Sequence, residues 1–205
     1  MFPISHFNIT RTPFYYYDKT LLSNTLAKLI RLAGERNYHV HYAVKANANP
    51  EILKLIAASG IGADCVSGGE IKAALEAGFP AKKIVFAGVG KADWEIEYAL
   101  EKKIFCFNVE SAEELSVIEE LAKKKENIAS IALRINPNID AHTHEYITTG
   151  LSENKFGIPI EMLDSIFSQI QRSPHVQLVG FHFHIGSQIL NLETCLLYTS
   201  DAADE

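Results

Sequence analysis

The sequence predicts an α/β fold built on a parallel sheet, because β-rich runs and helical runs alternate along most of its 205 residues. Two further observations favour a closed (β/α)8 TIM-type barrel over an open, doubly wound sheet. No G-x-G-x-x-G follows the first strand, and polar residues gather at the C-terminal ends of several strands, where barrel enzymes keep their active sites.

We expect a helix over 19–33, where Leu22, Leu26 and Leu29 recur at helical spacing, followed by a strand over 38–45. The alternation continues with helices over 51–58, 70–77, 92–100, 112–123 and 160–171 and with strands over 63–67, 83–89, 104–109, 129–136 and 177–185. A complete (β/α)8 barrel occupies about 250 residues. The chain is therefore expected to form an incomplete barrel, with about six of its eight strands.

Composition excludes several classes of protein. With 47% hydrophobic residues the chain can bury a substantial core, and its formal net charge of −6 argues against a nucleic-acid partner. Three cysteines without C-x-x-C spacing fit a reducing cytoplasm and suggest no structural zinc site. No leader peptide is evident, and no apolar run approaches the roughly 18 residues of a membrane span. We expect a soluble, cytoplasmic protein with no membrane partner.

The run from His39 to Asn47 reads as a buried strand that delivers one lysine, Lys45, at its C-terminal end. His41, Ala43 and Lys45 share one face of that strand, so Lys45 can face the barrel axis. An amine in such a place can form a Schiff base if desolvation lowers its pKa. The alternative is an ordinary surface lysine whose stem packs on apolar neighbours.

Polar residues at other strand ends complete the candidate set. With Lys45, they are Ser67, Glu110, Asn136, and His184 with Ser187. Arg134 lies mid-strand, opposite in face to Leu133 and Ile135, and a buried guanidinium requires a carboxylate. Asp64, also mid-strand, is the expected partner. A structural Arg–Asp pair inside the barrel and a pair that supports a cofactor ring from below are both compatible with this pattern.

The histidines His182 and His184 have two possible interpretations. Their i, i+2 spacing could ligate a metal, as in metal-dependent hydrolases built on barrels, and the pairs His39/His41 and His142/His144 share it. Such sites also need a carboxylate or bridging ligand late in the chain, and none follows a convincing strand, so we expect no metal. In the other reading, His184 stacks on a flat ring, and Ser187 with nearby N–H groups receives a phosphate oxygen, Gly186 permitting close approach.

Three motifs taken in order, Tyr42–Asn47, Gly62–Glu70 and His182–Gln188, resemble the alanine-racemase-fold, pyridoxal-phosphate-dependent decarboxylases, the enzymes of fold type III. Further motifs follow the branch of this family that acts on diaminopimelate. They are Phe86–Lys91, Arg134–Pro137, His144–Gly150 and Ser152–Gly157. The ornithine and arginine decarboxylases share the lysine and histidine motifs but not the Ser-Gly-Gly-Glu block, which stands at Ser67–Glu70 in this chain. The resemblance covers roughly Thr12 to Glu193.

The resemblance implies a role for each candidate. Lys45 would carry pyridoxal 5'-phosphate as an internal aldimine, and His184 would stack on the pyridine ring. Ser187, after Gly186, would contact the phosphate, while Asp64 and Arg134 match supporting positions beneath the cofactor. The implied reaction removes the carboxylate at the D-configured carbon of meso-2,6-diaminopimelate and gives L-lysine and CO2, the last step of lysine biosynthesis. A homodimer is also implied.

The chain departs from the family in its C-terminal part. Residues 1–193 read as a truncated PLP-binding barrel domain, and residues 194–205 do not resemble the family and are expected to be foreign sequence. The family's glycine-rich phosphate loop, pyridine-nitrogen glutamate, substrate arginine, acid cysteine and C-terminal β domain have no counterpart. We therefore expect a fragment that is inactive alone. The alternatives are a non-catalytic PLP-binding protein of the same fold, a related amino-acid decarboxylase, and a metal-dependent barrel hydrolase.

Overall fold

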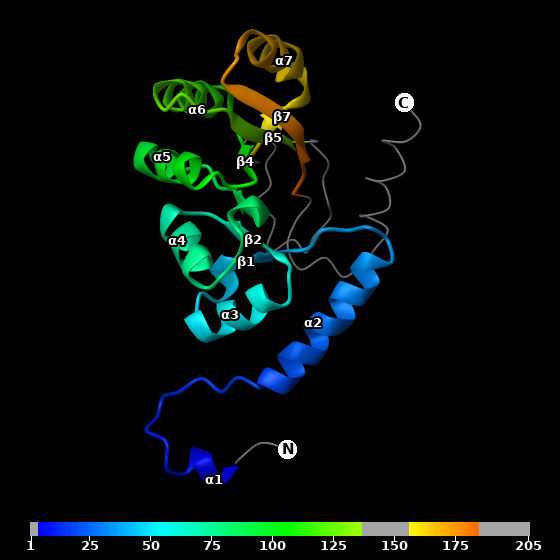
Figure 1. The fold of residues 1–205 in the computed structure, drawn as a ribbon, viewed down its shortest axis with the longest axis vertical. Coiled ribbons are helices and arrows are strands. Elements are labelled where there is room, and N and C mark those ends of the chain that lie inside the picture. Colours follow the sequence, from blue (N-terminus) through cyan, green and yellow to red (C-terminus); the bar gives the residue numbers. More distant parts are fainter. Residues whose placement is uncertain (1–3, 137–155, 185–205) are drawn as a thin grey trace, which may run out of the picture. The chain divides into compact units, whose positions relative to one another are not determined.

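The structure is a computed structural model that describes residues 4–136 and 156–184. The chain divides into two compact units, Met1–Val40 and His41–Glu205, and Figure 1 shows their elements.

The first unit contains the short helix α1 (Ile4–Phe7) and the long helix α2 (Lys19–Gly34). Asp18 caps α2, since its carboxylate accepts a hydrogen bond from the backbone N–H of Leu21 at 2.9 Å. The helix expected over 19–33 is therefore present, one residue longer at its C-terminal end.

The second unit is a parallel sheet whose strands are joined by helices. In chain order the strands are β1 (His41–Ala43), β2 (Gly62–Cys65), β3 (Ile84–Phe86), β4 (Cys106–Val109), β5 (Ala129–Asn136), β6 (Ile158–Pro159) and β7 (Val176–His182). The first five pair consecutively, and both β6 and β7 pair with β5. The six strands expected from the sequence are confirmed, and the two-residue strand β6 is an addition.

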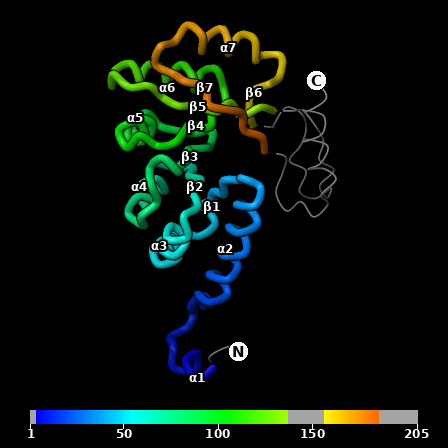
Figure 2. Tube along the Cα trace, turned by 45° about the vertical axis from the view of Figure 1, so that its right-hand side comes forward, coloured from blue at the N-terminus to red at the C-terminus, as the bar shows by residue number. Residues whose placement is uncertain are grey.

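Within the described residues, five α-helices lie between these strands. They are α3 (Pro50–Ala58), α4 (Gly68–Glu76), α5 (Asp93–Lys102), α6 (Ala112–Lys124) and α7 (Leu163–Arg172), with 3₁₀ turns at Val44–Ala46 (η1), Ala81–Lys83 (η2) and Ile160–Met162 (η4). In Figures 1 and 2 the helices from α3 to α6 follow one another along one side of the strands. This arrangement is a partial (β/α) barrel, as predicted.

The two faces of the sheet have different characters. Phe86, Phe107 and Leu133 belong to the face that packs against the helices, and each is at most 2% exposed. The rings of Phe86 and Phe107 pack against each other in a tilted arrangement, with their centroids 6.1 Å apart. Asp64 and Arg134 alternate with such residues and so belong to the opposite face, which is the interior face of a barrel. The interior face is therefore the polar one.

Two helices that follow strands begin with the same capping arrangement. The Ser67 hydroxyl accepts from the N–H of Glu70 at 3.2 Å, and the Glu70 carboxylate accepts from the N–H of Val66 at 2.8 Å. Ser111 and Glu114 repeat this pattern at the start of α6. Ser67, a candidate from the sequence, thus serves as the N-cap of α4.

Cys65 and Cys106 are buried on β2 and β4, and neither forms a disulfide. Burial raises the pKa of the Cys65 thiol to about 12 and that of Cys106 to about 11. Both thiols therefore remain protonated at neutral pH and are poor nucleophiles.

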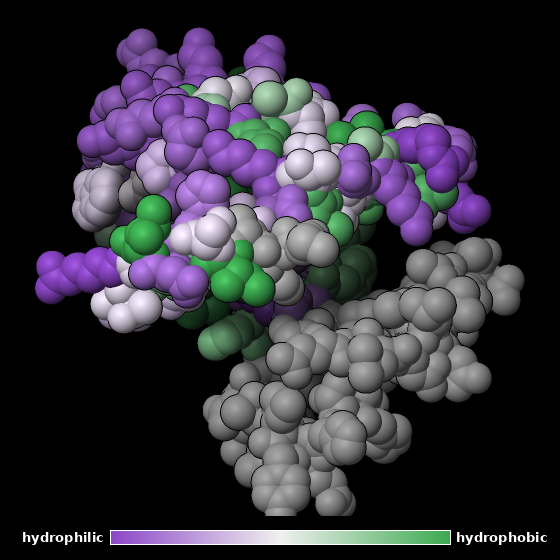
Figure 3. All heavy atoms as spheres, turned by 90° about the horizontal axis from the view of Figure 1, so that it is seen from below, coloured by the Kyte–Doolittle hydropathy of each residue, from purple (hydrophilic) through white to green (hydrophobic). Residues whose placement is uncertain are grey.

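In the coloured part of the face drawn in Figure 3, hydrophilic residues surround separate apolar patches. Among the described helices, none is both long enough and apolar enough to cross a membrane.

Candidate functional site

The carboxyl ends of the parallel strands bring most of the expected residues to one edge of the sheet. Lys45 follows β1, Glu110 follows β4, and His184 follows β7, while Asp64 and Arg134 lie within β2 and β5. Their charges act on one another: Arg134, Lys45 and Glu110 affect the pKa of His184, and Lys45 affects the pKa of Asp64. The edge therefore gathers an amine, a guanidinium, two carboxyl groups and an imidazole.

Lys45 lies in the 3₁₀ turn η1, because β1 ends earlier than the sequence indicates. The N–H of Asn47 donates to the carbonyl of Val44 at 3.1 Å, and the Tyr42 hydroxyl donates to the carbonyl of Asn47 at 3.1 Å. These bonds turn the chain away from the extended conformation. The expectation of a buried strand reaching Lys45 is thus wrong: β1 is half-buried and Lys45 is exposed. Lys45 lies two residues beyond the carboxyl end of β1.

Asp64 lies in β2 beside Ala43, with one carboxylate oxygen unsatisfied. Its Oδ1 atom is buried and accepts no hydrogen bond from the described part of the chain. Burial raises the pKa of this carboxyl group, and the amine of Lys45 opposes that rise. A buried, unpartnered oxygen is costly, so this position suits a ligand that can supply a donor.

Arg134 pairs with Glu110 and not with Asp64, which corrects the expectation from the sequence. Its Nη1 atom lies 2.6 Å from Oε2 of Glu110, and both side chains are largely buried. The reason is strand order. Glu110 follows β4, the neighbour of β5, whereas β2 lies three strands from β5, about 14 Å at a spacing of about 4.8 Å per strand.

Glu110 also holds the loop after β3. Its Oε1 atom accepts the backbone N–H of Gly88 at 3.0 Å. Gly88 has a φ of +99°, a conformation that favours glycine, and this brings its N–H to the carboxylate. The Glu110 carboxylate therefore links the loop after β3, at Gly88, to the side chain of Arg134 on β5.

A buried lysine, Lys91, extends this group of charges. Its Nζ atom donates to the carbonyls of Gly88 at 2.6 Å and Asn108 at 2.9 Å, and forms an ion pair with Glu114. Only 1% of the Lys91 side chain is exposed. Burial raises the pKa of Glu114, and Lys91 opposes that rise. Neither residue is among the candidates from the sequence, although the Ser-x-x-Glu spacing marks Glu114 as a helix cap.

His182 lies opposite Arg134 in the pairing of β5 and β7, which is interrupted by an irregularity between Ile131 and Ala132. Its Nδ1 atom is buried without a hydrogen-bond partner in the described residues. Burial, reinforced by Arg134 and His184, lowers the pKa of His182 to about 4. Burial also lowers the pKa of His184, with Arg134 and Lys45 adding to it. Both imidazoles are therefore neutral at pH 7.

Four of the remaining histidine, glycine and serine candidates cannot be placed. Gly186 and Ser187 lie outside the described residues, as do His142 and His144. Asn136 is the last residue of β5. Within the described part of the chain, no group of three or more His, Cys, Asp or Glu side chains could hold a metal ion.

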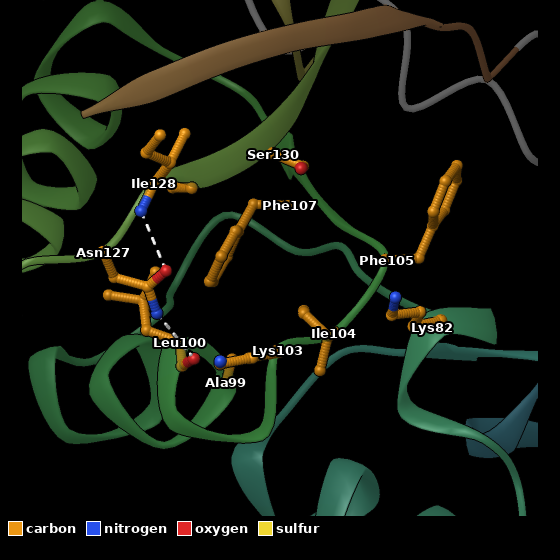
Figure 4. Close-up of a pocket in the computed structure, with 11 residues that line it drawn as sticks. Lys82, Ala99, Leu100, Lys103, Ile104, Phe105, Phe107, Asn127, Ile128 and Ser130 are labelled. Carbon is orange, nitrogen blue, oxygen red and sulfur yellow. Dashed lines mark hydrogen bonds between the residues drawn. The ribbon is translucent and has the colours of Figure 1, made fainter. Parts of the chain in front are cut away.

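A hollow of about 540 Å³ lies at the opposite, N-terminal ends of β4 and β5 (Figure 4). Its wall includes Leu100, Lys103, Phe105 and Ile128, and Asn127 donates to the carbonyl of Leu100 at 3.0 Å beside it. It contains none of the site residues predicted from the sequence. In barrels the N-terminal end of the strands serves stability, so we place the functional site at the other end.

The chemistry of the carboxyl edge suits a ligand with an aldehyde and a flat ring. Lys45 offers an exposed amine for a carbonyl carbon, and neutral His184 offers a ring for stacking. Asp64 offers a free acceptor, and Arg134 a positive charge that Glu110 balances.

Comparisons with known proteins identify relatives of this chain. A family model described as the pyridoxal binding domain of pyridoxal-dependent decarboxylases matches residues 23–204. Diaminopimelate decarboxylase of Bacteroides thetaiotaomicron is 58% identical over 193 residues, which cover 94% of this chain and 50% of that protein.

Two solved structures show the same fold. Diaminopimelate decarboxylase of Helicobacter pylori complexed with L-lysine aligns with a TM-score of 0.85 at 44% identity, over 98% of this chain and 51% of that one. The enzyme of M. jannaschii in complex with L-lysine aligns with a TM-score of 0.87 at 37% identity, over 98% and 48% respectively. The chain spans about half the length of the relatives it matches.

Proposed function

Because the chain belongs to the family of pyridoxal-dependent decarboxylases, as their pyridoxal binding domain, we propose that the complete protein decarboxylates meso-2,6-diaminopimelate to L-lysine and CO2. The relatives named diaminopimelate decarboxylase support the choice of substrate, and the L-lysine in two related crystal structures supports the product. The observation that carries the proposal is the position of Lys45 just after the carboxyl end of β1, where its charge affects the pKa of both Asp64 and His184.

The residues at this edge fit pyridoxal 5'-phosphate. Lys45 would bind the aldehyde carbon through Nζ, and His184 would pack against the pyridine ring. Asp64, whose Oδ1 lacks a donor in the described residues, and Arg134 would lie beneath the cofactor. Gly186 and Ser187 are proposed for the phosphate. When bound, this cofactor supplies an electron sink for the pair left by the departing CO2.

The protein's own groups have separable tasks. The unpartnered Asp64 oxygen can accept a hydrogen bond from the amine of Lys45 and so orient it. Neutral His184 can stack without placing a further positive charge over the ring. Glu110 neutralises Arg134, so that the guanidinium is held in place.

The test uses the complete protein that carries these residues. After incubation with pyridoxal phosphate and reduction with borohydride, peptide mass spectrometry should locate the cofactor on Lys45. Lys45→Ala should lose the adduct and the visible absorbance, whereas Lys54→Ala, at an exposed lysine of α3 paired with Glu51, should keep both. L-Lysine release from meso-diaminopimelate is then measured.

Two results would contradict the proposal. An adduct at another lysine, or none, would remove Lys45 from its role. An adduct at Lys45 without release of CO2 would instead indicate a non-catalytic PLP-binding protein of the same fold.

The homodimer and the cytoplasmic location expected from the sequence belong to this proposal as well. Family resemblance supports the dimer, and the composition supports the location. Analytical ultracentrifugation of the complete protein would show the dimer as a species of twice the chain mass.

A further inference from the structure

We propose that Glu110 is a positioning residue, which sets the place of the Arg134 guanidinium and of the loop after β3 relative to the cofactor. This inference rests on the proposed function. It goes beyond the residues expected to touch the cofactor, because Glu110 would act through Arg134 and through the backbone of Gly88.

Both carboxylate oxygens of Glu110 accept a hydrogen bond. Oε1 accepts the N–H of Gly88 at 3.0 Å, and Oε2 accepts Nη1 of Arg134 at 2.6 Å. Only 3% of the Glu110 side chain is exposed, so water competes little for these bonds. A charge-assisted bond to a guanidinium fixes its orientation as well as its charge.

The backbone of Glu110 is held just as firmly. It stands between the end of β4 at Val109 and the N-cap of α6 at Ser111. Its N–H donates to Oε2 of Glu114 at 2.9 Å. Glu114 also binds Lys91, whose amine returns to the carbonyl of Gly88 at 2.6 Å. The contacts close a ring that leaves Glu110 little freedom.

Arg134 depends on this anchor. A guanidinium has five N–H donors, and the described part of the chain accepts one of them, at Glu110. The ring of Phe156 lies 5.6 Å from the Arg134 guanidinium carbon and adds a second contact. Without the carboxylate, the side chain would keep its charge and lose its orientation.

The charge of Glu110 also reaches the imidazole that is proposed to meet the cofactor. At His184, Arg134 and Lys45 lower the pKa, and Glu110 raises it. A residue that only filled space would leave this balance unchanged. The effect therefore gives a readout that distinguishes positioning from packing.

The experiment compares Glu110→Gln with Glu95→Gln in the complete protein. Glu95 is a matched control: it is buried, and its two oxygens accept backbone N–H groups of Gly68 at 2.7 Å and Ala92 at 3.0 Å. It has no contact with Arg134 in the described structure. Both changes replace a buried carboxylate with an amide of the same shape.

We expect Glu110→Gln to weaken binding of pyridoxal phosphate about tenfold, since a hydrogen bond to a charged group is lost. In the cofactor-free protein, NMR titration should show a lower pKa for His184. Glu95→Gln should leave both quantities unchanged, and Glu110→Asp should recover part of the affinity. If Glu110→Gln does not fold, Glu110→Asp, with its shorter reach, carries the same test against wild type.

The inference is overturned if Glu110→Gln and Glu95→Gln alter cofactor affinity equally, or if the His184 titration does not move. Failure of the proposed function looks different. In that case the wild-type protein binds no cofactor, and the shift at His184 in the cofactor-free variant still decides the role of Glu110.

Discussion

The polar edge of the sheet has two halves that differ in how their charges are satisfied. The paired half, at the ends of β3, β4 and β5, consists of Lys91, Glu110, Glu114 and Arg134. The open half, at β1, β2 and β7, consists of Lys45, Asp64, His182 and His184. In the open half Asp64 Oδ1 and His182 Nδ1 are buried without hydrogen-bond partners among the described residues.

This difference suggests separate tasks for the two halves: the paired half is a structural frame that holds the strand ends, and the open half is the binding surface. Burying a polar group without a partner costs free energy, so unpaired groups persist where something else compensates them. The paired half has already satisfied its charges and holds three strand ends together. The open half has groups to offer a ligand. Changes in the paired half should therefore reduce stability, and changes in the open half should reduce binding.

The largest effect should follow Lys91→Met, which leaves the Glu114 carboxylate and two carbonyls without the amine they share. Removing one partner of a buried ion pair costs about 3–5 kcal/mol. Urea unfolding of the complete, cofactor-free protein measures this loss. A loss below about 1 kcal/mol would show that the paired half is not the frame.

Asp64→Asn should show the opposite balance. The variant removes a charge that burial disfavours, so the free energy of unfolding should stay within about 0.5 kcal/mol of wild type. Affinity for pyridoxal phosphate should fall about tenfold, as expected for the loss of a charged acceptor. Absorbance titration and urea unfolding measure the two effects. A loss of stability like that of Lys91→Met would erase the distinction between the halves.

His182→Gln sharpens the comparison through pH. Because the folded state lowers the pKa of His182 from 6.5 to about 4, the unfolded chain takes up a proton first as the pH falls. Stability is therefore lost between pH 6.5 and about 4, by about 1 kcal/mol per pH unit for one proton.

The Gln variant lacks this proton, so its stability should decline less steeply over the same window. Unfolding of wild type and variant at several pH values gives the difference, in which other titrating groups cancel. Parallel curves would mean that His182 is not the group that resists protonation.

The smallest effect should come from Lys72→Met, the matched control for Lys91→Met. Lys72 and Glu76 form an exposed pair at 3.9 Å on α4. Exposed pairs of this kind contribute about 0.5 kcal/mol or less, because water and salt screen them. The same urea unfolding should barely distinguish this variant from wild type. A loss of stability comparable with that of Lys91→Met would show that burial does not determine how much an ion pair contributes to the free energy of unfolding.

The sequence predicted the fold well where periodicity is unambiguous. The bounds of β5 agree with the expected 129–136, and the start of α2 at Lys19 agrees as well. Alternation of apolar and polar residues also assigned Arg134 to the face opposite Leu133 and Ile135. These features depend on local pattern alone, which a single sequence displays.

Features that depend on contacts between segments were harder to predict. The parity of β2 and β5 assigns Asp64 and Arg134 to the same face but does not give the distance between them. Glu110, one strand away, was the available partner. Similarly, an alternation of period two could not reveal that β1 ends at Ala43. The 3₁₀ turn that follows the strand is held by hydrogen bonds of Asn47 with Val44 and Tyr42, which the alternation does not encode. Lys91 is buried only because Glu114 and two carbonyls surround it.

The two buried cysteines provide built-in probes of local opening. Cys65 and Cys106 belong to β2 and β4, one beside Asp64 and the other on the strand that leads to Glu110. Only the thiolate reacts readily, and burial keeps both thiols protonated. A thiol-labelling reagent can therefore react with each cysteine only after its strand has opened to solvent. The rate of labelling at each thiol would then report, strand by strand, how often the native sheet opens and whether bound cofactor slows that opening.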